Sequence, residues 1–178
     1  MFDIENWVEN WLVDKYGTQA LAEPEAPEPL AAVAEAPVVD LGEDSSYNEY
    51  FKKSEFACKD CGAIVAMSND LIGVLTDIRV AVGKPVIIDS GYRCPEHNAA
   101  VGGQKNSQHL LAKAADFKIE GYSGRQLQAL ATTYSKNRIG GLGRSDHANY
   151  LHIDTREHLQ HLATWCYNSL GAVIPYYD

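Results

Sequence analysis

From residue 68 onward, apolar positions recur at spacings that distinguish helices from strands. Intervals of three and four residues predict a helix that begins after Ser68 and ends at Gly83, because serine often starts a helix and glycine often ends one. Further helices are expected at residues 95–101, 123–135 and 159–170. Short runs rich in strand-forming residues predict strands at 84–89, 114–119, 139–143 and 150–155.

The order of these elements indicates a fold class. Helices and strands alternate irregularly, and the strands are short and separated by glycine-rich turns. We therefore predict an α+β domain in which helices flank a small, mainly antiparallel sheet. This domain is expected to occupy residues 47–178.

The first 46 residues follow a different pattern. Apolar residues at helical spacing, including Trp7 and Trp11, predict an amphipathic helix over residues 1–19. Residues 20–46 hold four of the seven prolines and are expected to form a flexible linker. The helix either folds back onto the domain or docks to another protein. The long tether favours a protein partner.

The charge distribution excludes several kinds of partner. Residues 1–46 hold 11 of the 24 acidic residues and one of the 15 basic ones, so the remainder, with 13 acids and 14 bases, is nearly neutral. No nucleic-acid partner is expected, because a basic surface is missing. No run approaches the roughly 18 apolar residues of a membrane span, and the acidic start is unlike a signal peptide. We expect synthesis in the cytoplasm without a signal peptide and no membrane partner.

Two histidines and one aspartate form the main candidate site. Asp116 follows His109 by seven residues and falls in one expected strand, and His152 falls in a later one. Neighbouring strands lie about 4.8 Å apart, so side chains on one face of a sheet can converge on one ion. Catalytic zinc takes three protein ligands and leaves one position for water. These residues therefore predict one catalytic Zn²⁺ held by His109, Asp116 and His152.

Five short blocks add a resemblance to a known family. They are Ser90–Asn98, Val101–Gly103, Ser107–His109, Ala114–Asp116, and Gly140–Gly143 with His152–Arg156. In this order they resemble the M15 peptidases, over roughly residues 47–160. That family includes zinc D-alanyl-D-alanine carboxypeptidases and phage L-alanyl-D-glutamate endolysins, and the hedgehog signalling domain shares its fold.

The resemblance implies a hedgehog-like, D-Ala-D-Ala-peptidase-like fold and supports His109, Asp116 and His152 as zinc ligands. It also implies that Arg93 and Ser107 bind substrate, which suits arginine because its planar fork grips carboxylates. The alternatives are a surface arginine at Arg93 and a turn-capping serine at Ser107. The implied reaction is hydrolysis of the peptidoglycan stem peptide, either as a D-Ala-D-Ala carboxypeptidase or as an L-Ala-D-Glu endopeptidase. Such an enzyme would reach the cell wall as a phage lysin or virion component.

The sequence departs from the family pattern at two places. Ala112 stands where the family usually has glycine, which an alanine tolerates if φ is negative there. Tyr150 and Asn149 stand where many relatives carry a histidine or an acid before the last ligand.

The resemblance therefore assigns no catalytic base. Asp146 is our first choice as base and His147 the second, as acid or transition-state donor. Asp154 could instead orient a histidine ligand. The missing base also keeps open a non-enzymatic, zinc-stabilised module that binds cell wall or protein.

Four cysteines in a chain without a leader argue against a disulfide scaffold. Two pairs, Cys58 with Cys61 and Cys94 with His97, have the spacing of zinc ligands and suggest a second, structural Zn²⁺. The alternative is that the cysteines are small buried residues and that His97 belongs only to the substrate side. Cys166, inside the last expected helix, is interpreted as a core residue.

Overall fold

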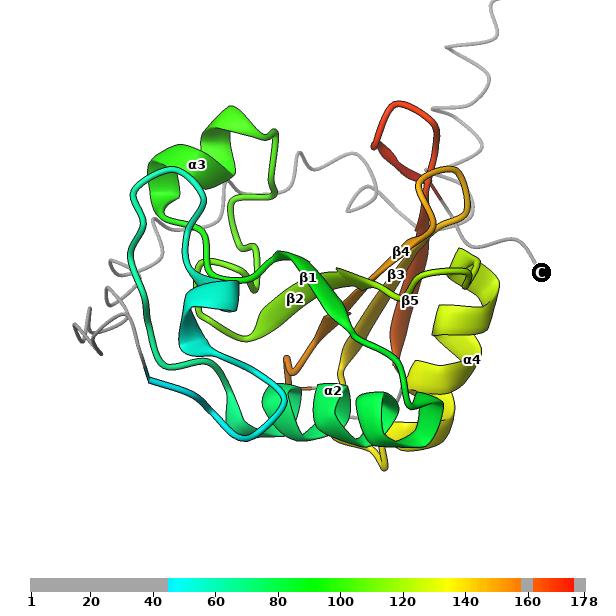
Figure 1. The fold of residues 1–178 in the computed structure, drawn as a ribbon. Coiled ribbons are helices and arrows are strands. Elements are labelled where there is room, and N and C mark those ends of the chain that lie inside the picture. Colours follow the sequence, from blue (N-terminus) through cyan, green and yellow to red (C-terminus); the bar gives the residue numbers. More distant parts are fainter. Residues whose placement is uncertain (1–44, 158–161, 175–178) are drawn as a thin grey trace, which may run out of the picture. The chain divides into compact units, whose positions relative to one another are not determined.

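The computed structural model describes residues 45–157 and 162–174 (Figure 1). The predicted helix at 1–19 and the predicted linker at 20–46, except its last two residues, lie outside the described residues. The helices are the 3₁₀ helix η2 (Lys53–Phe56), α2 (Asn69–Val82), α3 (Pro95–Ala100) and α4 (Gly124–Tyr134). The strands are β1 (Ile87–Ser90), β2 (Ala114–Lys118), β3 (Gly141–Ser145), β4 (Tyr150–Asp154), β5 (Ala163–Tyr167) and β6 (Val173–Ile174). Within the described ranges, no helix has the length and apolar character needed to cross a membrane.

The strands form one six-stranded sheet in the order β1-β2-β4-β3-β5-β6. All neighbouring strands are antiparallel except β3 and β5, which are parallel. The predicted α+β fold with a mainly antiparallel sheet is therefore confirmed. Strands β2 and β4 occupy central positions, so side chains on either face of them are well placed for burial.

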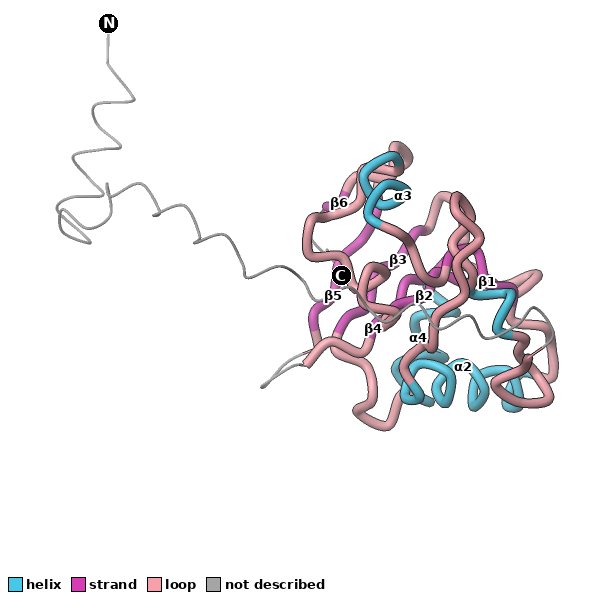
Figure 2. The backbone as a smooth tube through the Cα atoms, turned by 90° about the vertical axis from the view of Figure 1, so that its left-hand side faces the viewer, coloured by secondary structure: helices cyan, strands magenta, loops and turns pink. Residues whose placement is uncertain are grey.

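The sheet separates a helical core from the face that carries polar residues. Helices α2 and α4 pack together on one side, where α4 contacts β3 and β4, and α3 lies on the other side (Figures 1 and 2). Leu151 and Ile153 of β4 are fully buried. Because strand side chains alternate between faces, Tyr150, His152 and Asp154 must share the opposite face. The core therefore fixes which face receives the polar side chains.

Local signals placed most of these elements correctly. Gly83 follows α2 with φ of 67°, the left-handed conformation that ends many helices. The hydroxyl of Ser123 accepts the N–H of Gln126 at the start of α4. The strand expected at 84–89 is displaced, because β1 begins at Ile87, which is 43% exposed at the edge of the sheet.

The helix expected at 159–170 is wrong. Residues 163–167 form β5, residues 173–174 form β6, and residues 158–161 lie outside the described part. Thr164, Trp165 and Tyr167 favour strands, and the open edge of β3 supplies hydrogen-bond partners that a helical pattern does not register. Cys166 is buried as expected, but within a strand.

Candidate metal centre

The three predicted ligands meet on the face of the sheet opposite α2 and α4. Asp116 and His152 are direct partners in the β2–β4 pairing, and such partners point to the same face. His109 reaches them from the turn that precedes β2. His109 Nε2 lies 3.2 Å from His152 Nδ1 and 3.3 Å from Asp116 Oδ1, and His152 Nδ1 lies 2.8 Å from Asp116 Oδ1.

The triangle formed by these atoms fits a zinc ion. Zinc–nitrogen bonds of about 2.0–2.1 Å in a tetrahedral site place neighbouring ligand atoms about 3.3 Å apart. The three observed separations lie near this value, and both imidazoles are almost fully buried, at 2% and 5% exposure for His109 and His152. Two nitrogens and one carboxylate oxygen are also the donors that zinc accepts. The residues present therefore fit the ion.

Each histidine is oriented by a bond from its second ring nitrogen. His109 Nδ1 donates to the carbonyl of Gly91 at 2.6 Å, which leaves Nε2 for a metal. His152 Nε2 donates to the carboxylate of Asp154 at 3.1 Å, which leaves Nδ1 for a metal. Such partners set the tautomer and the ring orientation of metal-binding histidines. Asp154 therefore occupies the orienting position considered for it above.

Asp154 is itself held firmly. Its carboxylate is fully buried and accepts from Arg156 through Nε and Nη2, at 2.8 and 2.5 Å. A Cβ on Gly141, its partner in β3, would overlap this carboxylate. A Cβ on Gly143 would likewise overlap the indole of Trp165, whose ring centroid lies 5.2 Å from that of His152. The glycines of β3 thus make room for the groups that surround His152.

The electrostatics of the cluster suit a cation. Burial is the largest influence on His109 and lowers its pKa, so its ring is neutral. Burial opposes charge on His152 as well, but Asp116 and Asp154 outweigh it and raise the pKa of this ring. Burial raises the pKa of Asp116, whereas His109 and His152 lower it further, so the carboxyl ionises well below its usual range. A cation at this position would replace a proton on His152.

Of the two predicted substrate-binding residues, Arg93 lies beside the cluster. Its Nη2 donates to Asp116 Oδ2 at 2.5 Å, and its Nε donates to Ser90 at 2.8 Å. The hydroxyl of Ser107 accepts the N–H of His109 at 3.3 Å, which is the turn-capping role named as the alternative. The structure therefore brings Arg93 to the ligands and places Ser107 at the turn that presents one of them.

A cleft of about 330 Å³ opens beside Asp116. Its lining residues are Lys59, Asp89, Ser90, Arg93, His97, Val101, Asp116 and Tyr150. A larger hollow of about 440 Å³ lies between residues 118–126 and 148–149 and contains none of the three ligands, so the smaller cleft is the relevant one.

Sequence reasoning missed the aromatic residues beside this cleft. Tyr150 packs on Tyr167 with ring centroids 5.6 Å apart, and Trp165 packs on His152. The alternation of Trp165 and Tyr167 carries the signal, but only if that segment is recognised as a strand. Asp89, a carboxylate of the cleft, was missed because no motif marks it.

Asp146 and His147 lie in the turn between β3 and β4. The Asp146 carboxylate accepts from Arg144 Nε at 3.1 Å and lies 3.9 Å from Arg125. Arg144 in turn donates to Gln128 of α4, so Asp146 is held toward the helical side of the sheet. Among the contacts of the described residues, neither Asp146 nor His147 touches a metal-ligand candidate. Their catalytic role stays a prediction.

Ala112 has φ of 55°, so the condition set for it, a negative φ, is not met. The left-handed conformation costs an alanine about 1–2 kcal/mol relative to glycine. The segment between His109 and β2 nevertheless keeps the turn that a glycine would allow, because Ala112 is buried and its carbonyl accepts the N–H of Ser68.

Comparison with known proteins supports the resemblance. The model of the family Peptidase M15 matches residues 49–154. Peptidoglycan L,D-endopeptidase MepK of Escherichia coli K12 is 36% identical over 77 residues, which cover 40% of this chain and 41% of that protein. Zinc D-Ala-D-Ala carboxypeptidase of Streptomyces albus G is 29% identical over 103 residues, which cover 56% of this chain and 40% of that protein. The chain thus spans about two fifths of the length of these curated relatives.

Proposed function

Since this chain belongs to the peptidase M15 family, we propose that it is a zinc-dependent hydrolase of peptide bonds in the peptidoglycan stem peptide. The observation that carries the proposal is the triangle of His109, Asp116 and His152, whose spacing and donor atoms suit zinc. A zinc ion held there would polarise a peptide carbonyl and acidify a water molecule.

Arg93 is the residue we propose for substrate binding. Its guanidinium lies in the cleft and uses two of its N–H groups for Ser90 and Asp116. An arginine has further donors in the same plane, so it can grip a substrate carboxylate or carbonyl while it holds Asp116. A peptide with a carboxylate near the cleaved bond would then be placed beside the three ligands.

Two carboxylates compete for the role of proton acceptor. Asp146 remains our prediction from sequence, and its engagement with Arg144 would have to be released in the complex with substrate. Asp89 lines the cleft with Arg93 and Asp116, although Lys118 Nζ lies 2.8 Å from it. A base must reach the reacting proton directly or through one water molecule, and this requirement favours the cleft residue.

The substrate class rests on the relatives, which are named for an L,D-endopeptidase and a D-Ala-D-Ala carboxypeptidase. We propose the cell wall as the place of action. Action as a phage lysin or virion component, and a partner for residues 1–19, stay predictions.

The test is digestion of purified cell walls followed by mass spectrometry of the released fragments. Loss of terminal D-alanine would indicate a carboxypeptidase, and cleavage within the stem would indicate an endopeptidase. His152→Ala should lose both zinc and activity, whereas Asp70→Asn, an exposed change at the start of α2, should keep both. Full zinc content without any hydrolysis would refute the enzyme and favour the binding module, which the position of Asp146 keeps open.

A further inference from the structure

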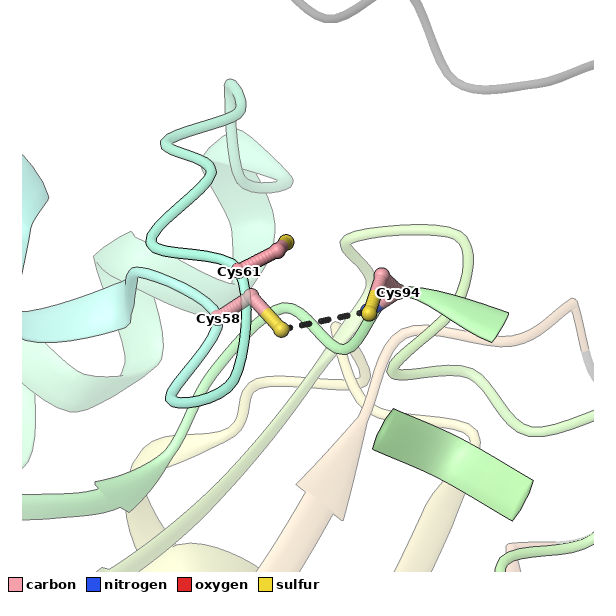
Figure 3. A group of neighbouring side chains, drawn as sticks. All are labelled: Cys58, Cys61 and Cys94. Carbon is pink, nitrogen blue, oxygen red and sulfur yellow. Dashed lines mark hydrogen bonds between the residues drawn. The ribbon is translucent and has the colours of Figure 1, made fainter. Parts of the chain in front are cut away.

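A second cluster of metal-binding side chains lies outside the centre described above. Cys58 and Cys61 belong to the loop that follows η2, and Cys94 immediately precedes α3 (Figure 3). The three sulfur atoms lie within 4.8 Å of one another. His97, in the first turn of α3, places its Nδ1 3.3 Å from the sulfur of Cys58. Two loops far apart in the sequence thus bring three sulfurs and one nitrogen together.

The backbone around the cluster is arranged to favour thiolates. The N–H of Cys94 donates to the sulfur of Cys58, and the N–H of His97 donates to the sulfur of Cys94, both at 3.4 Å. Gly62 closes the first loop with φ of 73°, and its N–H donates to the carbonyl of Cys58 at 2.9 Å. Backbone N–H groups stabilise the negative sulfur that binds metals.

From this geometry we propose that Cys58, Cys61, Cys94 and His97 bind a second, structural zinc ion. Three thiolates and one imidazole are a complete tetrahedral set, and they leave no position for water. Thiolate ligands also select zinc over magnesium or calcium, which prefer oxygen. This inference is independent of the proposed hydrolysis.

Burial of small apolar residues does not explain the cluster. Cys58 and Cys94 are buried, but Cys61 is exposed, so packing alone gives no reason for its thiol to turn toward the others. Cys166 is the matched case of a cysteine that packs alone, since it is buried within β5. The same chain therefore provides a control for the role of a cysteine as such.

A metal here would tie the loop after η2 to the segment that serves the candidate catalytic centre. Gly91, which accepts from His109, and Arg93, which donates to Asp116, both lie within three residues of Cys94. Tyr92 already donates its N–H to the carbonyl of Phe56 at 2.9 Å. His97 also lines the cleft. The second ion would hold this wall of the cleft in place.

The test combines metal counting with cobalt substitution of the full chain. Zinc-loaded Cys61→Ser should contain one zinc ion fewer than wild type, whereas Cys166→Ser should match wild type. Cys61 is the cysteine to change because its exposed side chain contributes little to the core.

Cobalt provides a readout that does not depend on activity. Thiolate-to-cobalt charge transfer absorbs in the near ultraviolet, and the centre at His109, Asp116 and His152 has no sulfur. The band should appear in wild type, persist in His152→Ala and be lost or strongly weakened in Cys61→Ser. A wild-type protein without the band, or a Cys58–Cys94 disulfide in the intact mass of freshly purified protein, would overturn the proposal.

Discussion

Asp154→Asn should weaken zinc binding at the candidate catalytic centre without removing a ligand. Asp154 accepts from His152 Nε2 at 3.1 Å and from Arg156 through both of its oxygens. An asparagine has one acceptor oxygen, so its amide NH₂ must face a donor from either His152 or Arg156. The orientation of the His152 ring is then lost or shared among several states.

The magnitude follows from two effects. Loss of the partner that orients a metal-binding histidine lowers metal affinity about 10–100-fold, or about 1.4–2.7 kcal/mol. Because Asp154 is fully buried, the mispaired amide should also cost about 1–3 kcal/mol of the free energy of unfolding of the metal-free protein.

Competition with a chelating dye measures the first effect, and urea unfolding of the metal-free protein measures the second. Asp77→Asn is the matched control, because Asp77 also accepts from an arginine, Arg138, at 2.7 Å but is partly exposed and belongs to α2. Equal zinc affinity in wild type and Asp154→Asn would show that Asp154 does not orient His152.

Three further predictions concern the same face of the sheet. Gly141→Ala should lower the free energy of unfolding by about 1–3 kcal/mol in urea titrations, because the new methyl group overlaps the Asp154 carboxylate. The pKa values of Asp116 and Asp154 are lowered from 3.8, despite burial, by His109 and His152 on the first and by His152 and Arg156 on the second, so the stability that these groups contribute is complete above that pH and is lost progressively below it. Asp154→Asn should flatten this acid limb, and an unchanged limb would contradict the assignment. Asp89→Asn should slow wall hydrolysis at least tenfold with zinc retained if Asp89 is the base, and a loss confined to Asp146→Asn would return the role to Asp146.

The metal centre could be predicted because its information is local. His109, Asp116 and His152 each lie in a short recognisable block, and strand alternation is enough to put Asp116 and His152 on one face. The helix cap at Gly83 was equally visible, since its φ is set by the residue type at one position. Where one residue or one period decides the structure, the sequence is sufficient.

The errors arose where distant partners decide. Residues 163–167 carry apolar side chains at a spacing compatible with a helix, and they form a strand because β3 offers a parallel edge. The position of Asp146 depends on Arg144 and α4, and the importance of Asp89 depends on the cleft that β1 borders. Neither follows from the spacing of residues along the chain.

The direct pairing of Asp116 with His152 has a consequence for folding. If β4 slipped by one residue along β2, His152 would turn toward the helices and Leu151 would replace it beside Asp116. Such a misaligned sheet could not assemble the three ligands, so it would gain nothing from zinc. The ion therefore acts as a selector of strand alignment, and refolding in its presence should yield fewer mispaired chains than refolding with a chelator.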